Sequence, residues 1–169
     1  MNSVARRVVH LSKIQLLVFD VDGVLTDGRL YFGARGEALK VFHVRDGHGI
    51  KLLMSSGVNV AAISGRRSPA VAIRMRELGV KTVVQGCGDK VAALEKIAGA
   101  LNIPLKACGC LVDDTPDMPL MAAVGFSGAV ADAHPLVVRA ADWVARRPGG
   151  QGAARELCDA ILRARAGRR

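Results

Sequence analysis

Short apolar runs alternate with amphipathic segments along most of the chain. Runs of strand length occupy residues 14–20, 58–64, 81–85, 107–113, 126–131 and, more weakly, 142–145. Between them, aliphatic residues recur every three or four positions, as in helices, over 47–56, 69–78, 89–101, 116–124 and 153–165. Alternating strands and helices favour right-handed crossovers and a parallel sheet covered on both faces. The pattern predicts one α/β domain, residues 1–169, with a doubly wound (Rossmann-like) sheet.

One segment interrupts this alternation. Residues 28–44, GRLYFGARGEALKVFHV, contain two extended halves around the glycine-bounded turn GARG. The pattern predicts a β-hairpin inserted directly after the first strand. An ordinary surface hairpin and a functional flap fit the pattern equally well. The position of the hairpin beside two aspartates favours the flap.

Charge and composition restrict the partners. The net charge of +9, with a basic tail at 164–169, favours an anionic partner: a nucleic acid, a membrane surface or a phosphorylated metabolite. Aromatic residues make up only 4% of the chain and form no series of stacking platforms for bases. No apolar run approaches the ~20 residues that span a bilayer, and residues 1–15 lack the apolar centre of a secretory signal. The four cysteines also lack metal-ligand spacing, so we expect a cytoplasmic protein with reduced thiols. Without stacking platforms or a spanning apolar run, we expect it to bind neither nucleic acid nor membranes.

Polar residues stand where the predicted strands end. In an open parallel sheet, ligands gather in the crevice beyond the carboxyl ends of the strands. The residues at those ends are Asp20 and Asp22 after the first strand, Ser64, Gly65 and Arg66 after the second, Lys90 at the start of a helix, and Asp113, Asp114 and Asp117 after the fourth.

Several carboxylates in a partly desolvated crevice repel one another unless a cation joins them. Their oxygens suit Mg²⁺, which typically takes one or two carboxylates, several waters and a substrate phosphate. Ser64 and Lys90 would complement such a site as a phosphate grip. Any one aspartate could instead be a helix N-cap or loop residue, and for Asp114 this alternative stays open. The set as a whole predicts a magnesium and phosphate site.

The sequences DVDGVLTDG, ISGRRS, Lys90 and VDDTPD resemble the four motifs of the haloacid dehalogenase superfamily. The resemblance implies that Asp20 is a nucleophile forming an aspartyl-phosphate and that Asp22 is the general acid and base. It also implies that Mg²⁺ is held by Asp20, by the backbone carbonyl of Asp22 and by Asp113. Ser64 and Lys90 would then hold the phosphoryl oxygens. An aspartate at position 22, where P-type pumps have threonine, favours a phosphatase.

The spacing of these motifs leaves no room for a cap domain. The segment from Asp20 to Ser64 is filled by the hairpin, a helix and a strand, and the segment from Ser64 to Lys90 by a helix, a strand and a turn. A capless site is open, which suits a macromolecular substrate or a lid from a neighbouring subunit. The hairpin carries more apolar residues than an isolated flap should expose, namely Leu30, Tyr31, Phe32, Leu39, Val41 and Phe42. We therefore predict that it packs against its own copies in a homo-oligomer.

A longer stretch, from DVDGVLTDG to GIKLL, together with ISGRRS, VADAHPLV and GGQGAARELCDAIL, resembles a capless tetrameric subfamily. Its members hydrolyse 3-deoxy-D-manno-octulosonate 8-phosphate in lipopolysaccharide precursor synthesis. Enzymes for nine-carbon sialic-acid-type 9-phosphates share much of the pattern, so that substrate stays open, as does a non-catalytic oligomerisation or binding module of the same fold. The resemblance implies a phosphorylated sugar acid contacted by Asp22, His43, Val44, Arg45, Asp46, Gly47, Lys51, Ser64, Gly65, Arg66, Arg74 and Lys90.

Some positions depart from that pattern or carry weaker signals. Val112 replaces a usual glycine, and His43 and Lys51 stand where asparagine and arginine are commoner, which leaves the exact sugar acid open. In the related tetramers the region of Gly150 and Gln151 can close a neighbour's site. Whether Asp114 and Asp117 are ligands or structural residues also stays open.

Overall fold

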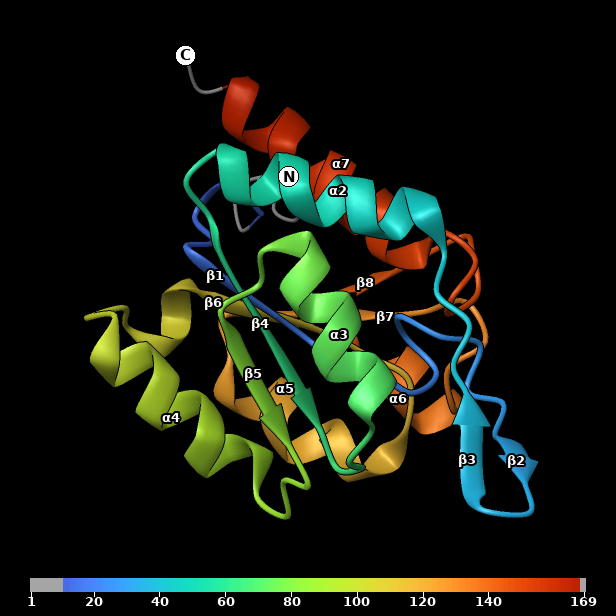
Figure 1. The fold of residues 1–169 in the computed structure, drawn as a ribbon. Coiled ribbons are helices and arrows are strands. Elements are labelled where there is room, and N and C mark those ends of the chain that lie inside the picture. The colour runs from blue at the N-terminus through green and yellow to red at the C-terminus, as the bar shows by residue number, and fades with distance from the viewer. Residues whose placement is uncertain (1–10, 168–169) are drawn as a thin grey trace.

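A computed structural model gives the structure of the protein and describes residues 11–167. Its centre is one six-stranded sheet in the order β5-β4-β1-β6-β7-β8, with every neighbouring pair parallel (Figure 1). The strands are β1 (Leu16–Phe19), β4 (Asn59–Ser64), β5 (Thr82–Gln85), β6 (Cys108–Val112), β7 (Phe126–Ala129) and β8 (Trp143–Val144). The predictions for residues 1–15 and for the tail at 164–169 fall partly outside the described residues.

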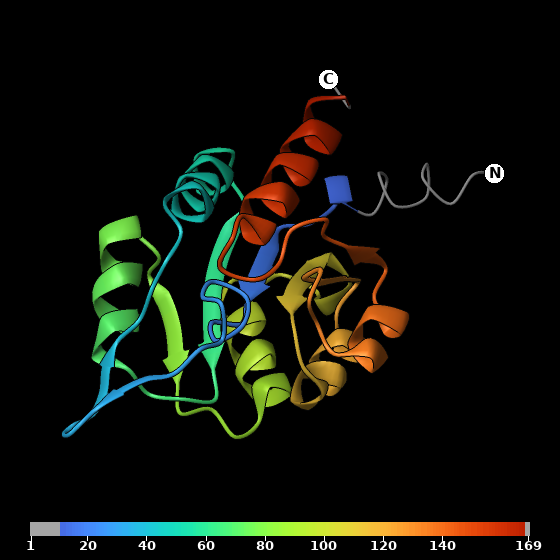
Figure 2. The same ribbon diagram turned by 90° about the vertical axis from the view of Figure 1, so that its right-hand side faces the viewer.

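Helices cover both faces of the sheet (Figures 1 and 2). One layer holds α2 (Val44–Ser55), α3 (Pro69–Leu78) and α7 (Ala153–Ala166), and the other holds α4 (Lys90–Ala100), α5 (Met118–Ala123) and α6 (Pro135–Ala140). Short 3₁₀ turns follow at Leu105–Ala107 and Thr115–Asp117. The predicted doubly wound parallel sheet is confirmed. Within residues 11–167, no helix combines the length and apolar character needed to cross a membrane.

The central strands lie in the core. Every residue of β1 is fully buried, because the strand has neighbours on both edges and helices on both faces. Its sequence, LLVF, is accordingly a continuous apolar run instead of an alternation. The chain turns from β1 towards β4 on one side and later returns to place β6 on the other side. This reversal of strand order creates the crevice in which α/β proteins bind ligands.

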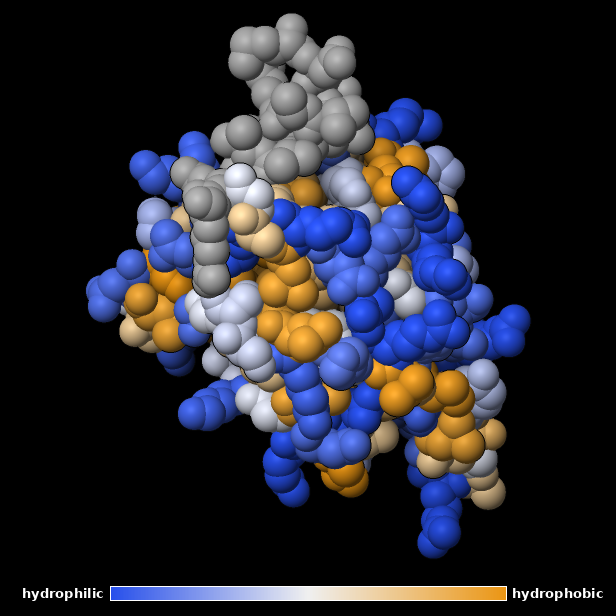
Figure 3. All heavy atoms as spheres, turned by 90° about the horizontal axis from the view of Figure 1, so that it is seen from above, coloured by the Kyte–Doolittle hydropathy of each residue, from blue (hydrophilic) through white to orange (hydrophobic). Residues whose placement is uncertain are grey.

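The predicted hairpin is a two-stranded antiparallel sheet of β2 (Tyr31–Gly33) and β3 (Gly36–Leu39) that projects from the body (Figures 1 and 2). It is shorter than expected from the extended halves of 28–44. Seen from above, one of several patches of hydrophobic residues lies at the lower right, on the side where the hairpin projects (Figure 3). Among its exposed apolar side chains, Phe32 has 63% of its surface accessible, and Leu30, Leu39 and Val41 about half. Its role as a flap stays a prediction.

Candidate active site

Three neighbouring strands deliver the predicted site residues to one edge of the sheet. Asp20 follows β1, Ser64 ends β4 and Asp113 follows β6, and β1 lies between the other two. A cavity of about 330 Å³ opens at this edge. It is lined by Asp20, Asp22, Ser64, Gly65, Arg66, Cys87, Gly88, Lys90, Asp113, Asp114, Pro116 and Asp117.

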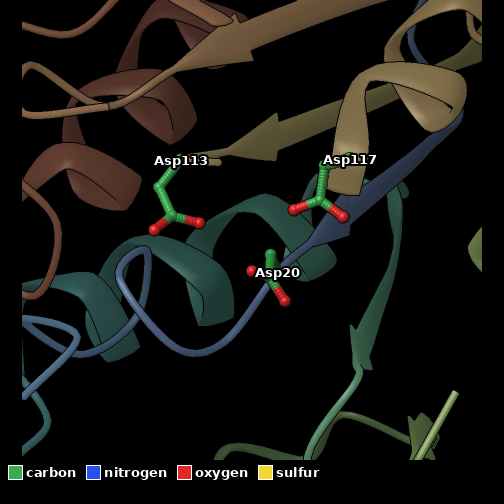
Figure 4. Close-up of side chains that lie close together, drawn as sticks. All are labelled: Asp20, Asp113 and Asp117. Atoms are coloured by element: carbon green, nitrogen blue, oxygen red, sulfur yellow. The ribbon is translucent and has the colours of Figure 1, made fainter. Parts of the chain in front are cut away.

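Three carboxylates point into a common space in this cavity (Figure 4). Asp20, Asp113 and Asp117 each offer an oxygen atom, and these oxygens lie within 4.8 Å of one another. Burial, followed by repulsion from Asp20, raises the pKa of Asp113 to about 8 and that of Asp117 to about 6. The three acids are therefore costly to ionise together without a cation. All-oxygen donors at this spacing fit a hard divalent ion such as Mg²⁺.

The loop after β1 brings its backbone against this cluster. Gly23 has φ +87°, and a Cβ at this position would overlap the Asp113 carboxylate. The turn at Gly149 and Gly150 packs against the same loop. A Cβ on Gly149 would overlap the Gly23 carbonyl, and Gly150 N donates to Val24 O at 2.9 Å. The glycines of DVDG and PGG therefore allow this close approach.

Lys90 supplies the positive charge inside the cluster. It is the first residue of α4, where the side chain of Asp89 caps the helix by accepting from Ala92 N at 3.0 Å. Its Nζ lies 2.9 Å from Asp20 Oδ1 and 2.6 Å from Asp117 Oδ1. Burial lowers the pKa of Lys90, but attraction to the two carboxylates outweighs it, and the net pKa is raised. Lys90 is therefore a cation at neutral pH, in position to bind a phosphoryl oxygen.

Asp22 also lines the cavity, but it is not part of the group of three carboxylates whose oxygens lie within 4.8 Å of one another. Its Oδ2 accepts from Ser64 Oγ at 3.3 Å, and its Oδ1 contacts Lys40 Nζ. Ser64 Oγ also accepts from Arg66 N at 3.1 Å, which fixes the turn after β4. A metal contact of Asp22 would have to use its backbone carbonyl, and this stays a prediction.

Two hairpin residues that no sequence motif marks, Lys40 and Glu37, also reach this region. Lys40 pairs with Asp22 and lies 3.1 Å from Glu37 Oε2, and its side chain is only 2% exposed. Glu37 in turn accepts from Ser68 Oγ at 2.6 Å and from Arg66 Nη2 at 3.4 Å. The Ser68 hydrogen bond is the largest of the effects that lower the pKa of Glu37. The hairpin is thus tied to the loop after β4 by charged side chains.

Several predicted substrate contacts lie away from the Asp20 cavity in this protomer. His43 and Arg45 line a separate cavity of about 310 Å³ with Gln151 and arginines of α7. The buried Asp46 accepts from Gly152 N at 3.3 Å and from Arg155 N at 2.8 Å, and burial raises its pKa. The remaining predicted contacts on the helices, Val44, Gly47, Lys51 and Arg74, belong to α2 and α3.

Packing between those helices explains the position of Arg74. A Cβ on Gly47 would overlap its guanidinium, which also pairs with Glu77 at 2.9 Å. Lys51 is exposed on α2. None of these side chains lines the Asp20 cavity of this protomer, so their role in substrate binding stays a prediction.

Comparisons with known proteins agree with this geometry. A model of the haloacid dehalogenase-like hydrolase family matches residues 82–157. The chain is 46% identical over 155 residues to 3-deoxy-D-manno-octulosonate 8-phosphate phosphatase KdsC of Yersinia pestis, which covers 92% of this chain and 83% of the relative. A crystal structure of the Yersinia pestis phosphatase matches with a TM-score of 0.93 and 44% identity, covering 95% of this chain and 86% of that one.

A second solved structure carries ligands. It is the Moraxella catarrhalis 3-deoxy-D-manno-octulosonate 8-phosphate phosphatase in complex with a magnesium ion, a phosphate ion and a KDO molecule. It matches with a TM-score of 0.93 and 35% identity, covering 96% of this chain and 93% of that one. The resemblance inferred from the sequence motifs is confirmed. The chain belongs to the 3-deoxy-D-manno-octulosonate 8-phosphate phosphatase family of haloacid dehalogenase-like hydrolases.

Proposed function

We propose that this protein is a Mg²⁺-dependent phosphatase that converts 3-deoxy-D-manno-octulosonate 8-phosphate to 3-deoxy-D-manno-octulosonate and phosphate. The observation that carries the proposal is the convergence of Asp20, Asp113 and Asp117 around one space, with Lys90 between two of them. The Yersinia pestis relative is a phosphatase for this sugar, and the Moraxella catarrhalis structure holds magnesium, phosphate and KDO. One domain without a cap would perform the reaction.

Asp20 is the proposed nucleophile. One of its carboxylate oxygens attacks phosphorus, the bond between phosphorus and the sugar oxygen breaks, and an aspartyl-phosphate forms. Protonated Asp22 gives its proton to the leaving sugar oxygen. The resulting Asp22 carboxylate then takes a proton from the water that attacks the aspartyl-phosphate, which releases phosphate and restores both acids. Ser64 and Lys90 hold the phosphoryl oxygens throughout.

Asp20 and Asp113 are the proposed carboxylate ligands of Mg²⁺, with the Asp22 carbonyl, and Asp117 lies close enough to join them. When bound, Mg²⁺ would offset the repulsion among the carboxylates and neutralise charge on the phosphoryl group. This role agrees with the raised pKa values of Asp113 and Asp117.

The far end of the sugar acid would meet cations outside the Asp20 cavity. The proposed contacts are Arg66 together with His43, Val44, Arg45, Asp46, Gly47, Lys51 and Arg74. Because most of them lie elsewhere on the protomer, we assign them to a site completed by a neighbouring subunit in a homotetramer. The exposed apolar hairpin supports such assembly. The proposed setting is the cytoplasm, where lipopolysaccharide precursors are made, without nucleic-acid or membrane partners.

A phosphate-release assay tests the proposal. The wild-type protein should release phosphate from 3-deoxy-D-manno-octulosonate 8-phosphate, EDTA should abolish release, and excess Mg²⁺ should restore it. Asp20→Asn should retain the fold and lose activity. A higher kcat/KM for a nine-carbon 9-phosphate would replace the assigned sugar, and equal activity of Asp20→Asn would contradict the nucleophile.

A further inference from the structure

We propose that Lys40 is a positioning residue that aims the Asp22 carboxylate at the leaving group. This inference rests on the proposed role of Asp22 as general acid. Lys40 follows β3 at the base of the hairpin, and its Nζ contacts Asp22 Oδ1. Its side chain is 2% exposed, a rare burial for a lysine and one that requires paired charges.

Lys40 reaches the cavity in which phosphate would bind only through its contact with Asp22. It is absent from the residues that line the Asp20 cavity, and its ammonium group is occupied by Asp22 and Glu37. Lys90, beside Asp20, already supplies a cation for phosphate binding. Lys40 therefore acts on the reaction through Asp22 and not by touching the substrate.

Both oxygens of Asp22 are held from different parts of the chain. Ser64 Oγ at the end of β4 donates to Oδ2, and Lys40 at the base of the hairpin binds Oδ1. Two donors on opposite oxygens restrict the rotation of the carboxyl group. An acid that must protonate a leaving oxygen depends on this restriction, because proton transfer needs hydrogen-bond contact.

Glu37 fixes Lys40 in turn. Its Oε2 lies 3.1 Å from Lys40 Nζ, while Ser68 and Arg66 donate to its two oxygens. Through these contacts Glu37 links Lys40 to the loop after β4.

Two substrates with different leaving groups can distinguish a positioning role of Lys40 from a purely structural one. The sugar phosphate leaves as a primary alkoxide, which needs a proton, whereas p-nitrophenyl phosphate leaves as a stable phenolate that needs little help. The parameter kcat/KM reports the steps up to leaving-group release. General acid catalysis is typically worth about 10²–10⁴-fold, so losing its alignment should affect the sugar phosphate selectively.

The experiment compares the wild type, Lys40→Met, Asp22→Asn and the double variant on both substrates with saturating Mg²⁺. Lys40→Met should lower kcat/KM about 100-fold for 3-deoxy-D-manno-octulosonate 8-phosphate and at most about fivefold for p-nitrophenyl phosphate. The double variant should match Asp22→Asn within about threefold on the sugar, because both changes remove one function. Lys96→Met, on the exposed face of α4, is the matched control and should leave both rates unchanged.

Equal losses on the two substrates, or a double variant that loses the product of both single effects, would overturn the inference alone. A wild type that cleaves neither substrate would overturn the proposed function and this inference with it. Folding is checked by the thermal midpoint. If Lys40→Met does not fold, Lys40→Arg takes its place, with a selective loss of about tenfold expected and a non-selective loss counting against the inference.

Discussion

Two regions of the molecule bury carboxylates, and each offsets the desolvation cost in a different way. Asp46 of α2 accepts hydrogen bonds from two backbone amides at the start of α7, Gly152 N and Arg155 N. At the strand ends, Asp20, Asp113 and Asp117 lie together, and Lys90 pairs with Asp20 and Asp117. Backbone amides at a helix start donate hydrogen bonds to one carboxylate and offset part of its burial cost. Three carboxylates beside one lysine still need a positive ion, and this difference separates a carboxylate held by backbone amides from a metal site.

The largest expected effect comes from removing one acid of the cluster. Asp113→Asn should lower phosphate release at least about 10³-fold, because the Mg²⁺ ligand is lost. The same change should raise the free energy of unfolding of the metal-free protein, because it removes the cost of burying an ionisable acid beside Asp20 and Asp117. Activity assays and urea unfolding in EDTA measure the two effects. A destabilised metal-free variant would contradict the assignment of strain to this cluster.

The matching change in the other region should affect stability instead. Asp46→Ala leaves the amides of Gly152 and Arg155 without their acceptor, and we expect a loss of about 1–3 kcal/mol in the free energy of unfolding. Urea unfolding measures this loss. Stabilisation by Mg²⁺ should stay as in the wild type, and its disappearance would show that the two regions are not separate.

Changing pH should distinguish the regions in the wild type. The pKa is raised to about 8 for Asp113 and to about 6 for Asp117, and that of Asp46 is also raised. Between the ordinary aspartate value of 3.8 and about 8, the folded metal-free protein therefore holds more protons than the unfolded chain. The free energy of unfolding should fall as pH rises through this window.

Mg²⁺ should reduce this dependence without removing it, because the ion relieves the cluster and leaves Asp46 unchanged. Urea midpoints from pH 4 to pH 9, with Mg²⁺ and with EDTA, provide the measurement. Identical slopes under both conditions would mean that the ion does not bind the titrating acids.

The two regions also differ in how much of each could be predicted from the sequence. Asp20, Ser64 and Asp113 could be predicted together because each follows an apolar run, and parallel strands end at one edge of the sheet. The role of Asp46 could not, because its partner Gly152 lies 106 positions away and only the docking of α7 on α2 brings them together. Lys40 was missed for a related reason, since its pairing with Asp22 depends on how the hairpin returns to the body. Helix α6 has six residues, too few for a recognisable period.

In the proposed site, acids from separate strands share one divalent ion. Calorimetric titration of the metal-free wild type, Asp113→Asn and Asp46→Ala with Mg²⁺ measures this binding. We expect one Mg²⁺ per chain in the wild type and in Asp46→Ala, and no measurable binding in Asp113→Asn. Undiminished binding in Asp113→Asn would contradict it.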